Sequence, residues 1–326
     1  MLQSSERERT AVTYQDIRPE FPLPKARGHL TKPHRGSLDG NTLSYAQALQ
    51  FAEGVQNLLF LHIPKTAGST FLRILDRQYG EKQSYWLDGH DSEASINQLT
   101  MLPESKRNNI RLLSGHMPFG LHTLLRGPHA YVTFLRHPVE RLISHYYFVR
   151  ENPYHYLHAH VVTSGMDLME YVQSGISPEL ENGQTKALSG NLGASSSDDL
   201  SLAKENLLQH FVAVGLTERF DESILLMRDR LNWKVPFYVS QNVTRNRPLM
   251  TDLPRRVIRA VERVNELDCE LYEYVAEKHH AAITDRGAEF QAQLRAFQSR
   301  NLNYQRMQCA RLLPRKVISR LAAFVR

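Results

Sequence analysis

The sequence predicts an α/β protein in which helices flank a central parallel sheet. The segment NLLFLHI at 57–63 is a short, nearly continuous apolar run, which is typical of a strand buried on both faces of such a sheet. The polar loop PKTAGS follows at 64–69, and from Phe71 apolar residues recur at helical spacing. A buried strand, a polar loop and a helix in succession predict a P-loop-like sheet.

Three further short runs of apolar and β-branched residues predict the other strands, at 110–114, 130–135 and 211–215. Pro138 suits the first position of the helix that follows the second of these runs. Elsewhere we expect a loop over 84–91 and a single amphipathic helix over 255–278.

The composition limits the partners that the chain can have. Its 326 residues suit one α/β domain with appendages, and 40 Lys and Arg against 34 Asp and Glu give a formal net charge of +6. This modest excess favours anionic ligands, but without a basic stripe it predicts no nucleic-acid partner. The chain has only two cysteines, Cys269 and Cys309, and neither an apolar signal segment nor a membrane-spanning run. We therefore expect a cytoplasmic protein.

The chain is expected to have three parts. Residues 1–45 are polar with scattered prolines, which predicts an extended or disordered arm, and residues 46–285 would form the α/β domain. Residues 286–326 would form a helical, basic tail. Its last part, RLLPRKVISRLAAFVR, mixes cations with apolar residues. It would either dock on the domain or make a peripheral contact at the inner face of a membrane.

The loop at 64–69 has the properties of a phosphate site. Its backbone N–H groups and the positive end of the following helix point at one place, where Lys65 adds a full charge. An ordinary capped turn is the alternative for this loop alone. The lysine precedes Gly68-Ser69-Thr70 and no second lysine follows, so the loop departs from the Walker pattern, and a P-loop kinase is disfavoured.

A second anion site is predicted where the run at 130–135 ends. Arg136 follows this run and can hold a phosphate with two parallel hydrogen bonds, and Ser144 lies eight residues later in the next helix. A surface arginine and an exposed helical serine are the alternative for this motif alone. Two such sites on one sheet predict a ligand with two separated phosphates.

These segments resemble a known family. HIPKTAGSTF at 62–71 resembles the 5′-phosphosulfate-binding loop of the sulfotransferases, and FLRHPVERLISHYYF at 134–148 resembles their 3′-phosphate-binding strand and helix. Both are similar to the branch that includes the heparan sulfate and uronyl 2-O-sulfotransferases. A weaker similarity continues through 182–190, 211–227 and 242–248.

The resemblance implies a sulfuryl donor, 3′-phosphoadenosine-5′-phosphosulfate (PAPS), as co-substrate, and no metal. It also implies which residues take the 5′-phosphosulfate: Lys65, Thr66, Ala67, Gly68, Ser69 and Thr70. Arg136 and Ser144 would take the 3′-phosphate. Lys65 would act in catalysis as well, because negative charge builds on the leaving phosphate in the transition state.

The acceptor hydroxyl needs a base, and His116 is the predicted one. It lies in SGHMPF, directly after the run at 110–114, and resembles a histidine of the glycan 2-O-sulfotransferases. A neutral imidazole near pH 7 is well suited to accept a proton. His90 is the reserve candidate, whereas His62 is expected to shape the end of its strand.

The sequence leaves the acceptor open. A carbohydrate hydroxyl is the leading expectation; the alternatives are a lipid or small-molecule alcohol, or a nucleotide-binding protein without catalysis. Arg245, Arg247 and the segment QTK at 184–186 would contact nucleotide, acceptor or only solvent. The histidines of HYLHAH at 155–160 lack a nearby carboxylate set or cysteine pair, so no metal site is expected there.

Overall fold

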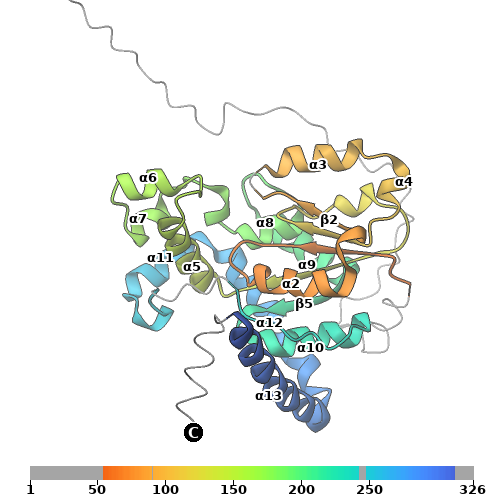
Figure 1. The fold of residues 1–326 in the computed structure, drawn as a ribbon. Helices are drawn as coiled ribbons and strands as arrows, with labels where there is room; N and C mark the ends of the chain where they lie inside the picture. Colours follow the sequence, from red (N-terminus) through yellow and green to blue (C-terminus); the bar gives the residue numbers. More distant parts are fainter. Residues whose placement is uncertain (1–53, 90, 242–246, 313–326) are drawn as a thin grey trace, which may run out of the picture. The chain divides into compact units, whose positions relative to one another are not determined.

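A computed structural model describes residues 54–89, 91–241 and 247–312 of the chain. The predicted arm at 1–45, the tail from residue 313, His90 and Arg245 lie outside the described residues. The described part is an α/β fold, as the sequence predicts, with a five-stranded parallel sheet between helices (Figure 1). The strands are β1 (Asn57–Leu61), β2 (Ser84–Leu87), β3 (Leu112–Gly115), β4 (His129–Leu135) and β5 (Phe211–Leu216).

The sheet separates two apolar cores, because successive side chains of a strand point to opposite faces. From β1, Leu58 and Phe60 enter the first core, whereas Leu59 and Leu61 enter the second. Within the described residues, the first core is covered by α2 (Gly68–Tyr79), α10 (Phe220–Leu231) and α13 (Gly287–Leu312), and Ile283 near the end of α12 joins it. The second is covered by α3 (Ser92–Met101), α8 (Gly183–Ser189), α9 (Ser197–His210) and α12 (Glu266–Thr284). Burial on both faces explains why the central strand is apolar from Leu58 to Leu61.

A third apolar cluster lies beside the sheet, where the helix after β4 packs against shorter helices (Figure 1). Its members are α5 (Pro138–Glu151), α6 (His158–Thr163), α7 (Leu168–Gln173) and α11 (Arg255–Val264). Pro138 occupies the first turn of α5, as predicted. The remaining short helices are α4 (Glu104–Arg107), η2 (Glu81–Gln83), η3 (Leu121–Leu124), η4 (Pro178–Leu180), η5 (Thr217–Arg219) and η6 (Met250–Asp252).

Two predictions of secondary structure are wrong. The expected loop at 84–91 contains β2, an edge strand that pairs with β3. This strand is only four residues long and has one buried side chain, Leu87, so its apolar run is too short to predict a strand. The single helix expected over 255–278 is divided into α11 and α12 at Asn265, whose φ and ψ are −123° and 38°. The side chain of Asn265 accepts a hydrogen bond from the Asn182 N–H (3.0 Å) and donates one to the Leu180 carbonyl (3.0 Å). Asn265 is therefore fixed by tertiary contacts.

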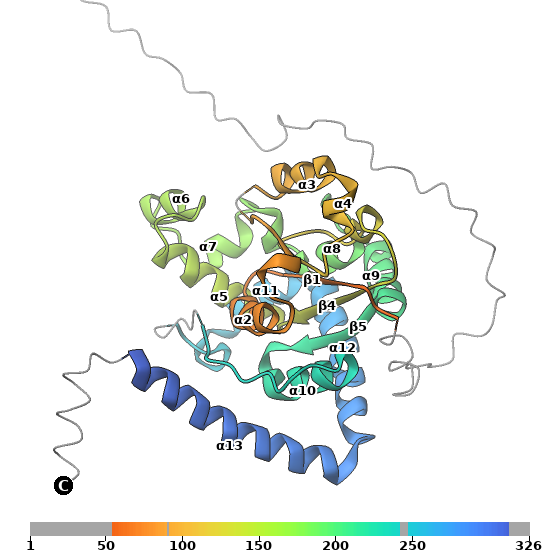
Figure 2. The same ribbon diagram turned by 45° about the vertical axis from the view of Figure 1, so that its right-hand side comes forward.

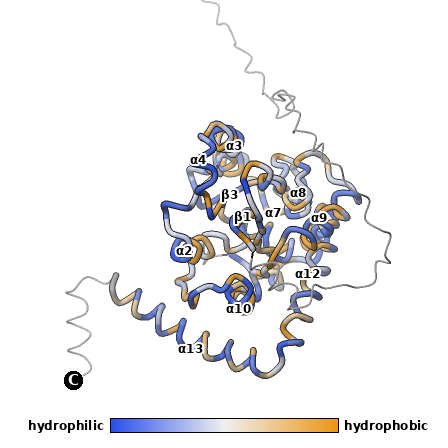
Figure 3. Tube along the Cα trace, turned by 90° about the vertical axis from the view of Figure 1, so that its right-hand side faces the viewer, coloured by the Kyte–Doolittle hydropathy of each residue, from blue (hydrophilic) through white to orange (hydrophobic). Residues whose placement is uncertain are grey.

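The first half of α13 is part of the packed fold. Phe290, Leu294 and Phe297 are buried in the first core, whereas Leu302 and Met307 are exposed further along the helix. Figure 2 shows α13 running beneath α10, and Figure 3 shows hydrophobic and hydrophilic residues mixed along it. Within the described residues, no helix has the length and apolar character needed to cross a membrane. The cytoplasmic location and the membrane contact of the tail stay predictions.

Candidate active site at the carboxyl ends of β1 and β4

The two predicted anion sites meet at one place in the fold. β1 and β4 are neighbours in the sheet. After β1 the chain continues to β2 at one edge of the sheet, and after β4 it continues to β5 at the opposite edge. Ligands of open α/β sheets bind at the carboxyl ends of strands at such a switch point. Lys65 lies in the loop after β1 and Arg136 directly follows β4, and Nη1 of Arg136 donates a hydrogen bond to the Lys65 carbonyl oxygen (3.1 Å).

The loop between β1 and α2 has an unusual backbone. Lys65 and Ala67 both have positive φ angles, 69° and 66°, although neither is glycine. Such conformations cost about 1 kcal/mol or more each and gather at ligand sites, because they turn successive N–H groups toward one concave surface. Ala67 occupies the N-cap position of α2 and its side chain makes no capping hydrogen bond. An anion at the start of α2 would take that role.

Two of the predicted hydroxyl groups hold the loop in place. Thr66 is fully buried, and its Oγ1 donates a hydrogen bond to the Ile63 carbonyl oxygen (2.8 Å). Oγ1 of Thr70 accepts a hydrogen bond from the Gln241 N–H (3.0 Å). Thr66 would therefore offer a ligand its backbone N–H, while Thr70 retains its own hydroxyl proton as a donor. Ser69 lies between them in the first turn of α2.

Lys65 lies near an aromatic ring and within electrostatic reach of two other cations, Arg136 and Arg247. Its Nζ lies 3.8 Å from the centroid of the Phe148 ring. Burial, followed by repulsion from Arg136 and Arg247, lowers the pKa of Lys65 to about 8, although Glu151 acts in the opposite direction. An anionic ligand would relieve this repulsion, so the site favours bound negative charge.

Arg136 is held from two sides. Its backbone N–H donates to Oε1 of Gln184 (3.0 Å), and Nε2 of Gln184 donates back to the Arg136 carbonyl oxygen (2.9 Å). Nη2 of Arg136 donates to Oε2 of Glu140 in the first turn of α5 (3.2 Å). The same carboxylate oxygen accepts a hydrogen bond from Nη1 of Arg247 (2.7 Å). Ser144 lies one helical turn beyond Glu140 and is buried.

The segment QTK supports Arg136 from α8. Gln184 and Thr185 are fully buried, and the Asp268 carboxylate caps the helix by accepting from their N–H groups (3.1 and 2.7 Å). The buried Arg141 guanidinium lies 3.7 Å from the same carboxylate. Lys186 is also buried, with Nζ 3.4 Å from Glu181. The sequence left open the alternative that this segment contacts only solvent, and that alternative is wrong because all three side chains are buried.

His116 follows β3 and lies against His62. The two rings are stacked with centroids 4.3 Å apart, and Nδ1 of His116 is 2.8 Å from the His62 carbonyl oxygen. A carbonyl oxygen only accepts, so Nδ1 of His116 carries a proton and Nε2 of the neutral ring has a lone pair. Burial, then the proximity of His116 and Lys65, holds the pKa of His62 well below its ordinary value. His62 is consequently a neutral packing partner.

A carboxylate that the sequence did not single out lies near His116. Oε2 of Glu179 is 3.0 Å from Nε2 of His145, and Nδ1 of His145 is 2.7 Å from the Tyr171 hydroxyl. Burial acts to raise the pKa of Glu179, but the hydrogen bond and charge of His145, followed by His116, bring it to about 2. Glu179 is therefore an anion within electrostatic reach of the predicted base.

Among the described residues, one histidine cluster has metal-ligand types close together. One ring nitrogen each of His122, His129 and His210 lies within 4.8 Å of the others, at the amino ends of β4 and β5. His122 and His129 are stacked face to face, with centroids 4.1 Å apart. Metal ions bind lone pairs in the plane of each ring, and stacked rings do not direct these toward one point. The three rings are better described as a packed cluster, in which burial lowers the pKa of each histidine.

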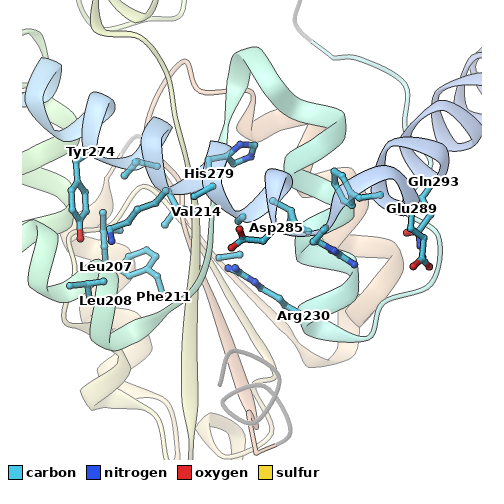
Figure 4. Close-up of a pocket in the computed structure, with 18 residues that line it drawn as sticks. Leu207, Leu208, Phe211, Val214, Arg230, Tyr274, His279, Asp285, Glu289 and Gln293 are labelled. Carbon is cyan, nitrogen blue, oxygen red and sulfur yellow. The ribbon is translucent and has the colours of Figure 1, made fainter. Parts of the chain in front are cut away.

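A cavity of about 700 Å³ lies against the edge strand β5, between α9, α10, α12 and α13 (Figure 4). Phe211 and Val214 form part of its apolar wall, and Arg230 and Asp285 add charged groups. None of the residues predicted to bind the sulfuryl donor lines this cavity. The cavity is therefore separate from the two predicted anion sites.

The geometry thus brings the two predicted anion sites together at the switch point of an α/β fold. Residues 50–187 match the model of the Sulfotransferase family, and this span includes both predicted phosphate sites and His116. The match does not single out the 2-O-sulfotransferase branch. A crystal structure of a mouse sulfotransferase complexed with PAP is similar over 66% of this chain and 67% of that chain, with 11% identity and a TM-score of 0.35. No curated protein matches the sequence.

Proposed function

We propose that this protein is a sulfotransferase that moves the sulfuryl group of PAPS to a carbohydrate hydroxyl. The observation that carries the proposal is the hydrogen bond between Arg136 and the Lys65 carbonyl, because it joins two anion sites from separate strands at the switch point. The family match over residues 50–187 supports the reaction class.

The donor would bind along the carboxyl ends of β1 and β4. Lys65 and the N–H groups of the loop at 66–70 would hold the phosphosulfate end, and Arg136 with Ser144 would hold the 3′-phosphate. As the bond between sulfur and the bridging oxygen breaks, its electron pair stays on the 5′-phosphate of the product, 3′-phosphoadenosine 5′-phosphate (PAP). Lys65 would stabilise this growing charge more strongly than the charge of the bound donor.

His116 would activate the acceptor. The contact with the His62 carbonyl fixes the tautomer that leaves the lone pair on Nε2, which is the form a general base needs. Nε2 would take the hydroxyl proton while the acceptor oxygen forms its bond to sulfur. Glu179, which lies within electrostatic reach of His116, would stabilise the imidazolium that results.

An exposed aromatic ring near His62, which stacks on this base, supports a sugar over a lipid as acceptor. Trp86 at the end of β2 is half-exposed, and its ring lies 6.5 Å from the ring of His62. A flat exposed indole offers an apolar face for the C–H side of a sugar ring and a polar N–H for a hydroxyl. The cavity against β5 could hold an apolar chain, but it is separate from the anion site.

The decisive experiment is incubation with isotope-labelled PAPS and a panel of glycans, lipids and phenols, followed by detection of the labelled product. We expect transfer to a glycan and loss of at least about 100-fold in kcat for His116→Ala. His160→Ala, an exposed histidine of α6, is the matched control. An unchanged rate in His116→Ala would show that another group is the base. Normal PAP binding by both Lys65→Ala and Arg136→Ala would remove the site assignment itself.

A further inference from the structure

Glu140 occupies the centre of the predicted 3′-phosphate site. Its Oε2 is bound by Arg136 and Arg247, and its Oε1 accepts a hydrogen bond from the Met250 N–H (3.0 Å). Ser144 is four residues further along α5, which places it on the same side of the helix. The Glu140 carboxylate therefore binds both arginines that would otherwise be available to a phosphate.

The carboxylate is a stable anion. Its side chain is largely buried, and burial acts to raise the pKa of Glu140. Hydrogen bonds from Arg247 and Met250, together with the charges of both arginines, outweigh this effect and lower the pKa below its usual range. A phosphate dianion that approached the same arginines would be repelled by this carboxylate.

One N–H donor of the Arg136 guanidinium is left without an acceptor in the part of the chain that the structure describes. The side edge of a guanidinium, Nε and Nη2, is the fork that grips a phosphate through two hydrogen bonds. In Arg136, Nη2 is taken by Glu140, whereas Nε is buried and has no acceptor within the described residues. The Glu140 carboxylate therefore accepts a hydrogen bond from only one of these two donors, Nη2. A phosphate on the same edge would accept from both Nε and Nη2.

We propose that Glu140 holds the place of the 3′-phosphate in the donor-free protein and that this phosphate displaces it from Arg136 and Arg247. This inference rests on the proposed function. Glu140 is then a specificity residue. A nucleotide with a 3′-phosphate would form hydrogen bonds with Arg136 and Arg247 once the Glu140 carboxylate has moved away. A nucleotide without a 3′-phosphate would leave the ion pairs of Glu140 with both arginines intact.

The test is the affinity of the full chain for PAP and for adenosine 5′-phosphate, measured by calorimetry in the wild type, Glu140→Gln and Glu140→Ala. Removing the competing charge should tighten PAP binding by roughly tenfold, since hydrogen bonds to charged groups have about that effect on affinity. Binding of adenosine 5′-phosphate should not change. Glu151→Gln is the control, because Glu151 ends the same helix and acts on Lys65 only through its charge. We expect it to leave the ratio of the two affinities unchanged.

Weaker PAP binding in both Glu140 variants would overturn the inference, because it would mean that Glu140 positions the arginines for the phosphate. An equal gain for both nucleotides would overturn it too, because the effect would then be general electrostatics. Thermal unfolding checks that each variant is folded, and the two substitutions give independent readings. If the wild type bound no PAP at all, the proposed function would fail; PAP binding that Arg136→Ala abolishes and Glu140→Gln weakens would refute this inference alone.

Discussion

Gly68 is where the structure predicts the sharpest effect of adding a single methyl group. A Cβ at this position would lie 1.8 Å from Nε2 of His62, whereas ordinary contact begins at 3.4 Å, so the ring would have to move by about 1.6 Å. His62 cannot move freely, because it is buried and stacked between Phe60 and His116, with centroids 5.3 and 4.3 Å away. Overpacking of this kind costs about 1–3 kcal/mol.

Gly68→Ala should therefore lower the melting temperature by about 2–6 °C, since each kcal/mol corresponds to roughly 2 °C in a chain of this size. It should also weaken PAP binding, because the shifted ring lies against the start of α2. Thermal unfolding and calorimetry measure the two effects, with Gly54→Ala as the control, since a Cβ there meets nothing within 4 Å. If the clash is with the ring, Gly68→Ala should cost much less in a His62→Ala background. An equal cost in both backgrounds would refute this reasoning.

Two other predictions follow from the same site. Because the pKa of Lys65 is lowered to about 8, its positive charge is present below that pH and is lost above it. The kcat/KM for sulfuryl transfer should therefore fall as the pH rises through about 8, and Lys65→Arg should remove this decline; a decline that persists in the variant would assign it to another group. Gln184→Ala would leave the backbone N–H and carbonyl of Arg136 without their partners. It should cost about 1–3 kcal/mol in denaturant unfolding and weaken PAP binding; an unchanged midpoint and affinity would contradict the supporting role of Gln184.

The sequence predicts the central part of the fold well because β1 and β4 are buried on both faces. Their sequences are nearly continuous apolar runs, and the sharp change to polar residues at 64–69 and at Arg136 follows the end of each strand. β2 is an edge strand of only four residues, SYWL, and Leu87 is its one buried side chain, so its apolar run is too short to predict a buried strand. Parallel strands also explain why Lys65 and Arg136 could be expected together, since their strand ends share one edge of the sheet.

Side-chain contacts of the site could not be predicted in this way. Gln184 is 48 residues from Arg136 in sequence and reaches it only because α8 packs against the sheet. Glu140 lies four residues from Arg136, a spacing that allows an ion pair, but a glutamate in the first turn of a helix is equally expected to interact with the helix dipole alone. Its second partner, Arg247, is 107 residues away. Motifs show which residues can bind phosphate, but the tertiary structure decides which anion they contact.

The wrong helix prediction over 255–278 and the support of Arg136 have the same cause. The break at Asn265 lets its side chain accept a hydrogen bond from the backbone N–H of Asn182. Asn182 has a positive φ of 46° and occupies the N-cap position of α8. Asp268, in the first turn of the helix after the break, then caps α8, and this helix presents Gln184 to the backbone of Arg136. A continuous amphipathic helix would satisfy the local pattern but would lose these contacts. Local rules fail most often where a site needs support, and this failure is linked by hydrogen bonds through Asn182, Asp268 and Gln184 to the predicted phosphate-binding arginine.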